Sequence, residues 1–381
     1  MKLRSGLGVA AVAVACAWWS LAAREAPADP QREGPAPPVV LLEGAPDGAE
    51  TRVMLRAVAT NARPRVLGVV THVAGSARRG TVVARAGVSP RVYVVAAERP
   101  SRRGSTYESA LWRVDEGAAA VRLAGELTDA SRALVTARGS VVVQRGRDGD
   151  EPTLTDRVLR ERVDALSLDV VDPASGALRA AWTGRGMIAF LAAPLRGDEA
   201  LVYHVHEGGA SLFALDVSTR ATRTIIDRMD PLARDFSYDA ARDEVAFVRA
   251  SERRAGVWEV VTVPAHGPPR APEEAQVRWR AASDHLMPRL LRDGALVISL
   301  PDDKGLGVIE AFPRLPARVA PLGDGADEAL GESDDGRWVA LRHRTQGREV
   351  LGLYERASHR AVQLDEGGDA VEFAGFATVT P

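Results

Sequence analysis

Two histidines, His204 and His206, have the spacing that comes closest to a metal site in this sequence. They alternate along an apolar run that is predicted to be a strand, so both imidazoles would lie on one face and could ligate one transition metal. No third ligand can be identified, and polar alternation on a half-exposed strand explains the pair better. The sequence therefore predicts no resident metal, with His204 and His206 as the candidates if one is bound.

Three acidic pairs could instead bind calcium at loop mouths. They are Asp115–Glu116, Asp302–Asp303 and Asp334–Asp335. Acidic side chains in turns usually accept hydrogen bonds from nearby backbone N–H groups, so we expect a structural role for them. The segment around Asp335 is not a sialidase Asp-box either, because Gly336 follows the aspartate directly.

The composition excludes several classes of function. The chain has 381 residues, of which 46% are hydrophobic and 26% charged, and its formal net charge is -2. No basic field that would gather nucleic acid is expected, so we predict no nucleic-acid partner. The single cysteine, Cys16, lies in an N-terminal apolar run, so the folded part can contain neither a disulfide nor a cysteine-based zinc site. We predict no cofactor.

Residues 1–23 are predicted to be an export signal or lipoprotein signal. Lys2 and Arg4 precede an apolar run that extends from Ser5 to Ala23. Cys16 ends a sequence that resembles a lipoprotein box, Ser20-Leu21-Ala22 would permit ordinary cleavage, and the uncut run is long enough to span a bilayer. All three fates stay open. We expect a periplasmic or outer-membrane-associated protein that touches the membrane only through this lipid or anchor.

After this signal, the composition and the pattern of apolar runs predict a Pro-rich linker, residues 24–38, and one all-β domain, residues 39–381. Residues 24–38 contain five prolines and few apolar side chains, as is typical of a linker. Residues 39–381 consist of short apolar or alternating runs separated by Gly, Asp and Pro. One helical pattern, Leu154 to Val163, is expected in an insertion. The predicted strands are Arg91–Ala97, Ser140–Arg145, Ala200–His206, Asp243–Ala250, Gly256–Val263, Ala295–Leu300 and Arg337–Arg342.

These strands belong to a weak repeat. Each unit has a turn that ends in Gly or Asp, an apolar strand, a charged loop, and a second strand that often carries an aromatic residue. Units that start near residues 90, 128, 185, 228, 277, 325 and 368 are on average about 46 residues apart, which is close to the period of propeller blades.

One unit carries a resemblance to a known family. Ser333-Asp334-Asp335-Gly336-Arg337-Trp338-Val339-Ala340-Leu341, followed by Leu353-Tyr354, resembles the WD40-like repeat of TolB-like bacterial envelope proteins, although Asp334 stands where proline is usual. The resemblance implies an all-β fold, a β-propeller of four-stranded blades, in which the Asp and Gly form the tight turn between outer and inner strands. The residues that match this blade-turn motif are Asp239, Asp293, Gly294, Asp335 and Gly336.

The number of blades is expected to be six or seven, with seven favoured. A ring that is not closed exposes two sheet edges, and each edge invites pairing with another chain. We therefore expect the segment from Val371 to Val379 to complete a blade with N-terminal strands from the region Arg65 to Ala86.

The resemblance implies an exported, non-catalytic propeller that binds an unidentified protein partner in the cell envelope. Trp279, in a predicted connecting segment between Arg278 and Arg280, is the candidate partner contact, with core packing as its alternative role. No catalytic residues are identified, and we predict that the chain is not an enzyme. No Gly-x-Ser-x-Gly elbow or hydrolase domain follows the repeats, so a propeller-capped serine peptidase is not expected. A glycosidase or lyase with acidic residues lining the channel is the alternative.

Overall fold

The computed structural model describes residues 36–377, with gaps at 46, 59–62, 86–87, 101–106, 129–131, 147–163, 301–304, 310–316, 320, 324, 346–347 and 365–369. The expected export signal with Cys16, most of the predicted linker, the predicted helix at Leu154–Val163 and the acidic pair Asp302–Asp303 lie outside the described residues. Within the described part of the chain, no helix is long and apolar enough to cross a membrane.

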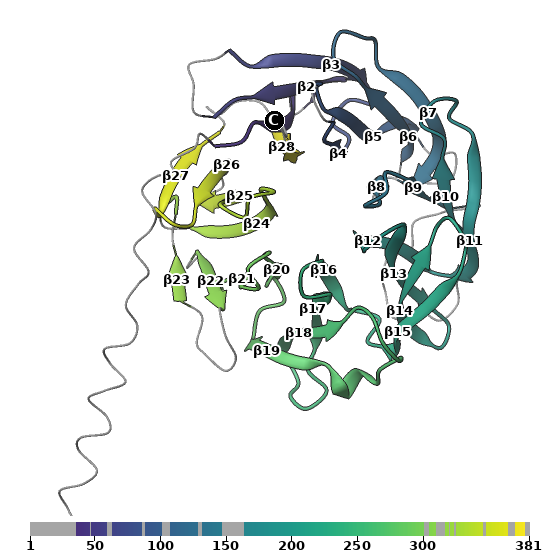
Figure 1. The fold of residues 1–381 in the computed structure, drawn as a ribbon, viewed down its shortest axis with the longest axis vertical. Helices are drawn as coiled ribbons and strands as arrows, with labels where there is room; N and C mark the ends of the chain where they lie inside the picture. Colours follow the sequence, from purple (N-terminus) through teal and green to yellow (C-terminus); the bar gives the residue numbers. More distant parts are fainter. Residues whose placement is uncertain are drawn as a thin grey trace, which may run out of the picture. The chain divides into compact units, whose positions relative to one another are not determined.

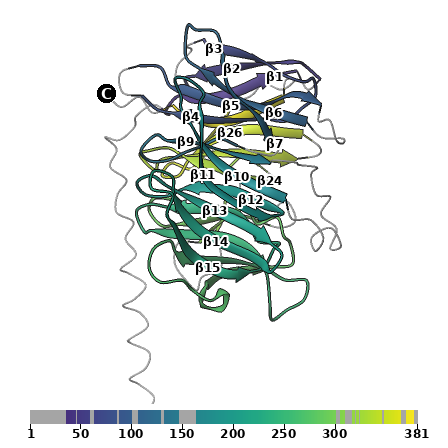
Figure 2. The same cartoon turned by 90° about the vertical axis from the view of Figure 1, so that its right-hand side faces the viewer.

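Antiparallel sheets, all but one of them of four strands, are arranged around a ring, and an edge strand of each four-stranded sheet lies nearest the centre (Figure 1). One sheet has the order β28-β1-β2-β3 and is called the closing sheet below. Its strands are β1 (Val39–Gly44), β2 (Glu50–Arg56), β3 (Arg65–Thr71) and β28 (Ala370–Phe376). In the view turned by 90°, β1, β2 and β3 lie beside β5 and β6 of the next sheet (Figure 2).

The next sheet contains eight strands, in two sets of four that are joined by a single pairing between Leu127 and Arg145. The first set is β4 (Arg78–Val83), β5 (Arg91–Pro100), β6 (Tyr107–Val114) and β7 (Val121–Thr128). The second set is β8 (Leu134–Val135), β9 (Val141–Gly146), β10 (Asp164–Val171) and β11 (Leu178–Gly186).

Four sheets of four consecutive strands complete the described ring. They are β12 (Ile188–Pro194), β13 (Glu199–His206), β14 (Gly209–Asp216) and β15 (Thr222–Met229); β16 (Arg234–Asp239), β17 (Glu244–Ala250), β18 (Trp258–Pro264) and β19 (Gln276–Ala281); β20 (Arg289–Leu290), β21 (Leu296–Ser299), β22 (Leu306–Ile309) and β23 (Ala317–Val319); and β24 (Ala326–Glu332), β25 (Trp338–Thr345), β26 (Arg348–Glu355) and β27 (Arg360–Gln363). A turn of 3-10 helix, η2 (Pro272–Glu274), precedes β19.

The hydrogen bonding thus gives six sheets, and counting the eight-stranded sheet as two sets gives seven sets of four strands. The all-β prediction is confirmed, and each of the seven predicted strands overlaps a strand of the structure. The strand pairing alone does not choose between six and seven blades, because that choice depends on how the eight-stranded sheet is counted.

The period of two along each strand explains how neighbouring sheets pack. On β17, Val245 and Phe247 belong to one apolar cluster with residues of β13 and β14, whereas Ala246 and Val248 belong to another with residues of β21. Successive side chains of a strand point to opposite faces of its sheet, so a central strand that is apolar on both faces fills the space on both sides. The core is therefore divided among the interfaces between sheets.

The closing strand was predicted correctly, and the other strands of its sheet only in part. β28 overlaps the expected segment, and it pairs antiparallel with β1. We expected its partners in residues 65–86; β3 does belong to the closing sheet, whereas β4 pairs with β5 in the next sheet. The partner of β28 is Val39–Gly44, an apolar run in which Val39, Val40, Leu41 and Leu42 are all fully buried. Its continuous apolar character, bounded by Pro38 and Gly44, is the signal that identifies such a strand.

A series of arginines joins the turns of successive sheets. Each turn links the first and second strands of its sheet. Arg196 Nε donates to the carbonyl oxygen of Ala240 at 2.9 Å, and Arg242 Nη2 donates to that of Asp293 at 3.3 Å. Arg292 Nη2 lies 2.9 Å from Asp334 Oδ1. Each of these contacts connects one sheet to the same turn of the sheet that follows it.

Candidate functional site

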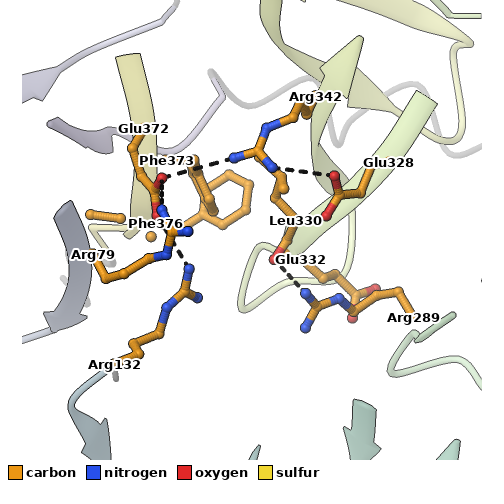
Figure 3. Close-up of a pocket in the computed structure, with 13 residues that line it drawn as sticks. Arg79, Arg132, Arg289, Glu328, Leu330, Glu332, Arg342, Glu372, Phe373 and Phe376 are labelled. Atoms are coloured by element: carbon orange, nitrogen blue, oxygen red, sulfur yellow. Dashed lines mark hydrogen bonds and ion pairs between the residues drawn. The ribbon is translucent and has the colours of Figure 1, made fainter. Parts of the chain in front are cut away.

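A pocket of about 340 Å³ lies at the centre of the ring, beside β28 (Figure 3). Its charged lining consists of four arginines and three glutamates. They are Arg79, Arg132, Arg289, Arg342, Glu328, Glu332 and Glu372. Arg79 is on β4, Arg132 precedes β8, Arg289 begins β20 and Arg342 is on β25, so four different sets of strands each supply one guanidinium.

Glu372, on β28, connects three of these arginines. Arg79 Nη1 donates to its Oε2 at 3.0 Å, Arg132 Nη2 donates to its Oε1 at 3.3 Å, and Arg342 Nη2 lies 3.9 Å from its Oε2. Figure 3 shows all three guanidiniums directed at this one carboxylate. The side chain of Glu372 is only 12% exposed, so these pairs are less screened than ordinary surface ion pairs.

Glu328 is held by its cross-strand partner. It lies opposite Arg342 in the register of β24 and β25, and Arg342 Nη1 donates to Glu328 Oε2 at 3.3 Å. Opposite charges that face one another across a strand pair stabilise the sheet modestly. Arg342 therefore contacts both Glu328 and Glu372, which links β24 and β25 to the closing strand.

Glu332 lines the pocket, but its carboxylate bonds to groups beside the turn that follows β24. The backbone N–H of Arg292 donates to Glu332 Oε2 at 2.9 Å, and Arg356 Nη1 lies 3.9 Å from Oε1. Its side chain is 8% exposed, and this burial raises the pKa of the carboxyl. Glu332 therefore forms no hydrogen bond or ion pair with the four pocket arginines among the described residues, although its charge raises the pKa of Arg289.

Arg289 differs from the other three arginines. Its guanidinium donates to two backbone carbonyls of β24, with Nη2 2.7 Å from the oxygen of Leu330 and Nε 3.4 Å from that of Ala329. Among the described residues, no carboxylate lies within 4 Å of it. Burial and the nearby charge of Arg132 lower the pKa of Arg289. The carbonyls fix the orientation of this cation without neutralising it.

Asp235, on β16, is a partly buried carboxyl whose pKa is raised. Its φ is +57°, which is uncommon for a residue other than glycine, and the pairing of β16 with β17 is irregular here, between Arg234 and Ser237. Within the described part of the chain, Oδ2 is buried and has no hydrogen-bond partner, and Arg234 Nε is 3.8 Å away. Burial raises the pKa of Asp235 to about 6, and the charge of Glu328 also raises it.

The two candidate metal ligands lie together on one face of β13, as their spacing predicts, with ring centroids 5.1 Å apart. His204 packs against the edge of Trp182, and its Nε2 lies 3.0 Å from the carbonyl oxygen of Arg185, while the backbone N–H of Gly208 donates to His206 Nδ1. Burial lowers the pKa of His204. No cluster of three metal-ligating side chains occurs among the described residues, so neither histidine is joined there by a third ligand.

Of the residues of the blade-turn motif, Asp293, Gly294, Asp335 and Gly336 lie in turns and Asp239 is the last residue of β16. Each is at the connection between the first and second strands of one sheet rather than between an outer and an inner strand. Asp335 Oδ1 accepts hydrogen bonds from the Ser333 hydroxyl at 2.6 Å and from the Arg337 N–H at 3.1 Å. Asp239 accepts from the N–H groups of Ala241 and Arg242, and Asp293 from that of Ala295. Gly294 and Gly336 have φ of +84° and +72°, which explains the glycine at both positions.

The two acidic pairs that the structure describes already have other partners. Asp115 pairs with Arg85, Arg91 and Arg113 at 2.8 to 3.0 Å. Asp334 pairs with Arg292, as described above. Their role is structural, but Asp115 and Asp334 pair with arginine side chains instead of the expected backbone N–H groups, which only Asp335 accepts among these four residues.

Trp279 lies on strand β19 and not in a connecting segment, which corrects the prediction. It is half-buried and packs against the cluster that contains Val260 and Leu286. The strand was missed because its two apolar side chains, Val277 and Trp279, are separated and flanked by arginines, of which Arg278 is buried and lies 3.8 Å from Glu244. A partner contact at Trp279 stays a prediction, and packing is the role that the structure shows.

Sequence reasoning did not find the pocket arginines. They are spread from position 79 to position 342 and belong to no shared motif, so no local pattern in the sequence indicates that they lie together. The sequence-based alternative of acidic residues lining a channel named no positions; the acidic residues of the pocket are Glu328, Glu332 and Glu372.

A comparison with protein-family models finds no match, and a comparison with curated protein sequences finds none either. Solved structures do match. The β-propeller domain of the Trilobed protease from Pyrococcus furiosus matches with a TM-score of 0.50 and 10% identity, over 88% of this chain and all of that one. A putative 6-phosphogluconolactonase from Bacteroides fragilis matches with a TM-score of 0.51 and 13% identity, over 88% and 98%.

The fold is a β-propeller. The resemblance to the propeller of TolB-like proteins is thereby confirmed at the level of the fold. TolB from Acinetobacter baumannii is among the matches, with a TM-score of 0.46 and 9% identity over 89% of this chain. A puromycin-hydrolyzing peptidase from Mycobacterium tuberculosis matches with a TM-score of 0.53 and 14% identity over 76% of this chain. This chain spans 66% of the length of TolB and 46% of that of the peptidase.

These matches correct the prediction that the chain is not an enzyme. That prediction was inferred from the fold, and the same fold occurs in a peptidase and in a putative lactonase. Function depends on the residues of a site and not on the fold that carries it, so a propeller fold does not exclude catalysis.

Proposed function

We propose that this protein is an exported β-propeller of the bacterial cell envelope that recognises a protein partner, and that the pocket beside β28 is where the partner binds. The pocket is the observation that carries the proposal. It is a hollow of about 340 Å³ in which charged side chains from four sets of strands converge. Export is supported by Lys2, Arg4 and the apolar run that follows them.

A charge reversal at the pocket tests this proposal. Arg132→Glu places a carboxylate beside Glu372, and the matched control is Arg228→Glu on the outer strand β15, where the side chain is 86% exposed. Wild-type protein and both variants are used to capture proteins from envelope extracts, after their thermal unfolding has been compared. We expect a defined protein to be lost with Arg132→Glu and retained with Arg228→Glu. Capture that is unchanged, or lost equally with both, would contradict the proposal.

A second candidate function, general acid–base catalysis in the channel, is favoured by Asp235. Its raised pKa keeps a fraction of this carboxyl protonated near neutral pH, whereas Glu328 is bonded to the Arg342 guanidinium. Two carboxyl groups in such different environments are the arrangement that glycosidases use. The test is a panel of neutral and acidic glycosides with wild type, Asp235→Asn and Glu328→Gln. Turnover that both variants abolish supports this function, and turnover that neither variant changes contradicts it.

A further inference from the structure

We infer that the pocket beside β28 is an oxyanion site, in which a phosphate or carboxylate group binds to Arg289 and Arg132. This inference rests on the proposed function, because it names the chemistry of the group that is placed in that pocket.

After the arginines and glutamates of the pocket have paired, a net positive charge remains in the pocket. Glu328 is bonded to Arg342, and Glu332 to groups beside its own turn, as described above. Glu372 is the one pocket carboxylate that remains for Arg79 and Arg132, and it also lies near Arg342. Arg289 has no carboxylate partner among the described residues. The four guanidiniums therefore exceed the negative charge that is available to them within the pocket.

Arg289 is the best oriented of the four for a ligand. Its Nε and Nη2 are already directed at the carbonyl oxygens of Ala329 and Leu330, which leaves the donors of Nη1 for an incoming group. Arg132 lines the same pocket. Its charge lowers the pKa of Arg289, whereas the charges of Glu328 and Glu332 raise it. A doubly charged oxyanion between the two cations would relieve this repulsion and accept charge-assisted hydrogen bonds from both.

The rest of the lining strengthens such an interaction. Leu330 and Phe376 are half-buried beside the charged residues and contribute apolar surface. Apolar surface lowers the local dielectric, so the same pair of charges interacts more strongly than it would on the open surface. A cation would be repelled by the same guanidiniums.

Calorimetric titration of the full-length protein at constant ionic strength tests the inference. The probes are inorganic phosphate and succinate, with succinamide as an uncharged analogue of succinate. We expect saturable binding of at least one anion and none of succinamide. Arg289→Gln should weaken the binding by about 10-fold or more, because a charge-assisted hydrogen bond and a charge are lost. Arg289→Lys should have an intermediate effect, and the control Arg228→Gln should have none.

The two anions distinguish the source of the oxyanion. Binding of phosphate alone indicates a phosphoryl group, and binding of succinate indicates a carboxylate such as an acidic side chain or a chain terminus. The inference is overturned if neither anion binds, if succinamide binds as tightly as succinate, or if Arg289→Gln and Arg289→Lys both bind like the wild type. If neither anion binds while Arg132→Glu still abolishes partner capture, the inference fails and the proposed function stands.

Discussion

Glu372 accepts a hydrogen bond from Arg79, a residue 293 positions earlier in the chain, at 3.0 Å. The bond joins the closing strand β28 to β4, the first strand of the next sheet, beside the pocket. The integrity of the ring and the geometry of the pocket therefore depend on the same carboxylate.

Replacement of Glu372 should have opposite effects on the stability of the ring and on anion binding in the pocket. Glu372→Gln removes the charge that three arginines share, so we expect the free energy of unfolding to fall by about 1 to 2 kcal/mol, because the arginines are partly exposed. The same variant should bind phosphate or succinate more tightly, because the competing carboxylate is gone. Glu349→Gln, which removes a more exposed partner of Arg342, is the control. Urea unfolding and calorimetric titration measure the two effects, and weaker anion binding by Glu372→Gln would contradict the account of the pocket.

The two phenylalanines of β28 should differ in their contribution to stability. Phe373 is 8% exposed and packs in the cluster that contains Trp338 and Leu41, whereas Phe376 is only half-buried. Phe373→Ala should lower the free energy of unfolding by about 3 to 5 kcal/mol, and Phe376→Ala by about 1 to 2 kcal/mol. Their rings are 5.3 Å apart, so the double variant should not be additive. Equal and small losses in urea unfolding would show that β28 does not hold the ring closed.

Asp235 should make the protein less stable as the pH rises through about 6. Its pKa in the folded state is about 6, above the ordinary value of 3.8 that the unfolded chain has. The neutral form is therefore favoured by folding, and the stability that it contributes is complete below pH 4 and is lost as the carboxyl ionises. Asp235→Asn keeps a side chain that tolerates positive φ.

We therefore expect Asp235→Asn to be more stable than the wild type by on the order of 2 to 3 kcal/mol at pH 8, and nearly equal to it at pH 4. Urea unfolding at both pH values gives the difference between the two proteins, which removes the effect of other titrating groups. Asp334→Asn, at an exposed aspartate in a turn, serves as the control. A difference that does not change with pH would contradict the raised pKa.

Export can be tested at Cys16. We expect the protein in the envelope fraction of cells, and mass spectrometry of its N-terminus distinguishes lipidation at Cys16 from cleavage after Ala22 and from an intact chain. If Cys16 is lipidated, labelled palmitate is incorporated and Cys16→Ser abolishes the label. Protein found only in the cytosol would contradict export.

The turns were predictable because their chemistry is local. An aspartate that accepts neighbouring N–H groups, followed by a glycine with positive φ, needs only four or five residues to be identified, as at Asp335-Gly336 and Asp293-Gly294. Strands such as β13 and β17 were also predictable, because each is a short apolar run that can be identified from its own residues. β19 was not, because Arg278 is buried there by a charge partner, Glu244, on another strand.

The pocket was not predictable, because its chemistry depends entirely on ring geometry. Arg79, Arg289 and Arg342 are ordinary strand residues in the sequence, and each acquires its role only when the inner strands surround one centre. The partner of β28 was missed for a related reason. Periodicity locates a strand, but it does not say which of several N-terminal strands will lie beside it.

The pairing of β28 with β1 also fixes an order in time. Val39–Gly44 is synthesised before all the other described strands and Ala370–Phe376 after them, so β1 must wait for the rest of the ring before this partner exists. Until then, the β1 edge of the closing sheet is unpaired, and the apolar cluster that contains Leu41 and Trp338 lacks Phe373. The ring is therefore complete only after β28 has been made, and its closure cannot precede the folding of the other described strands into one chain-wide arrangement.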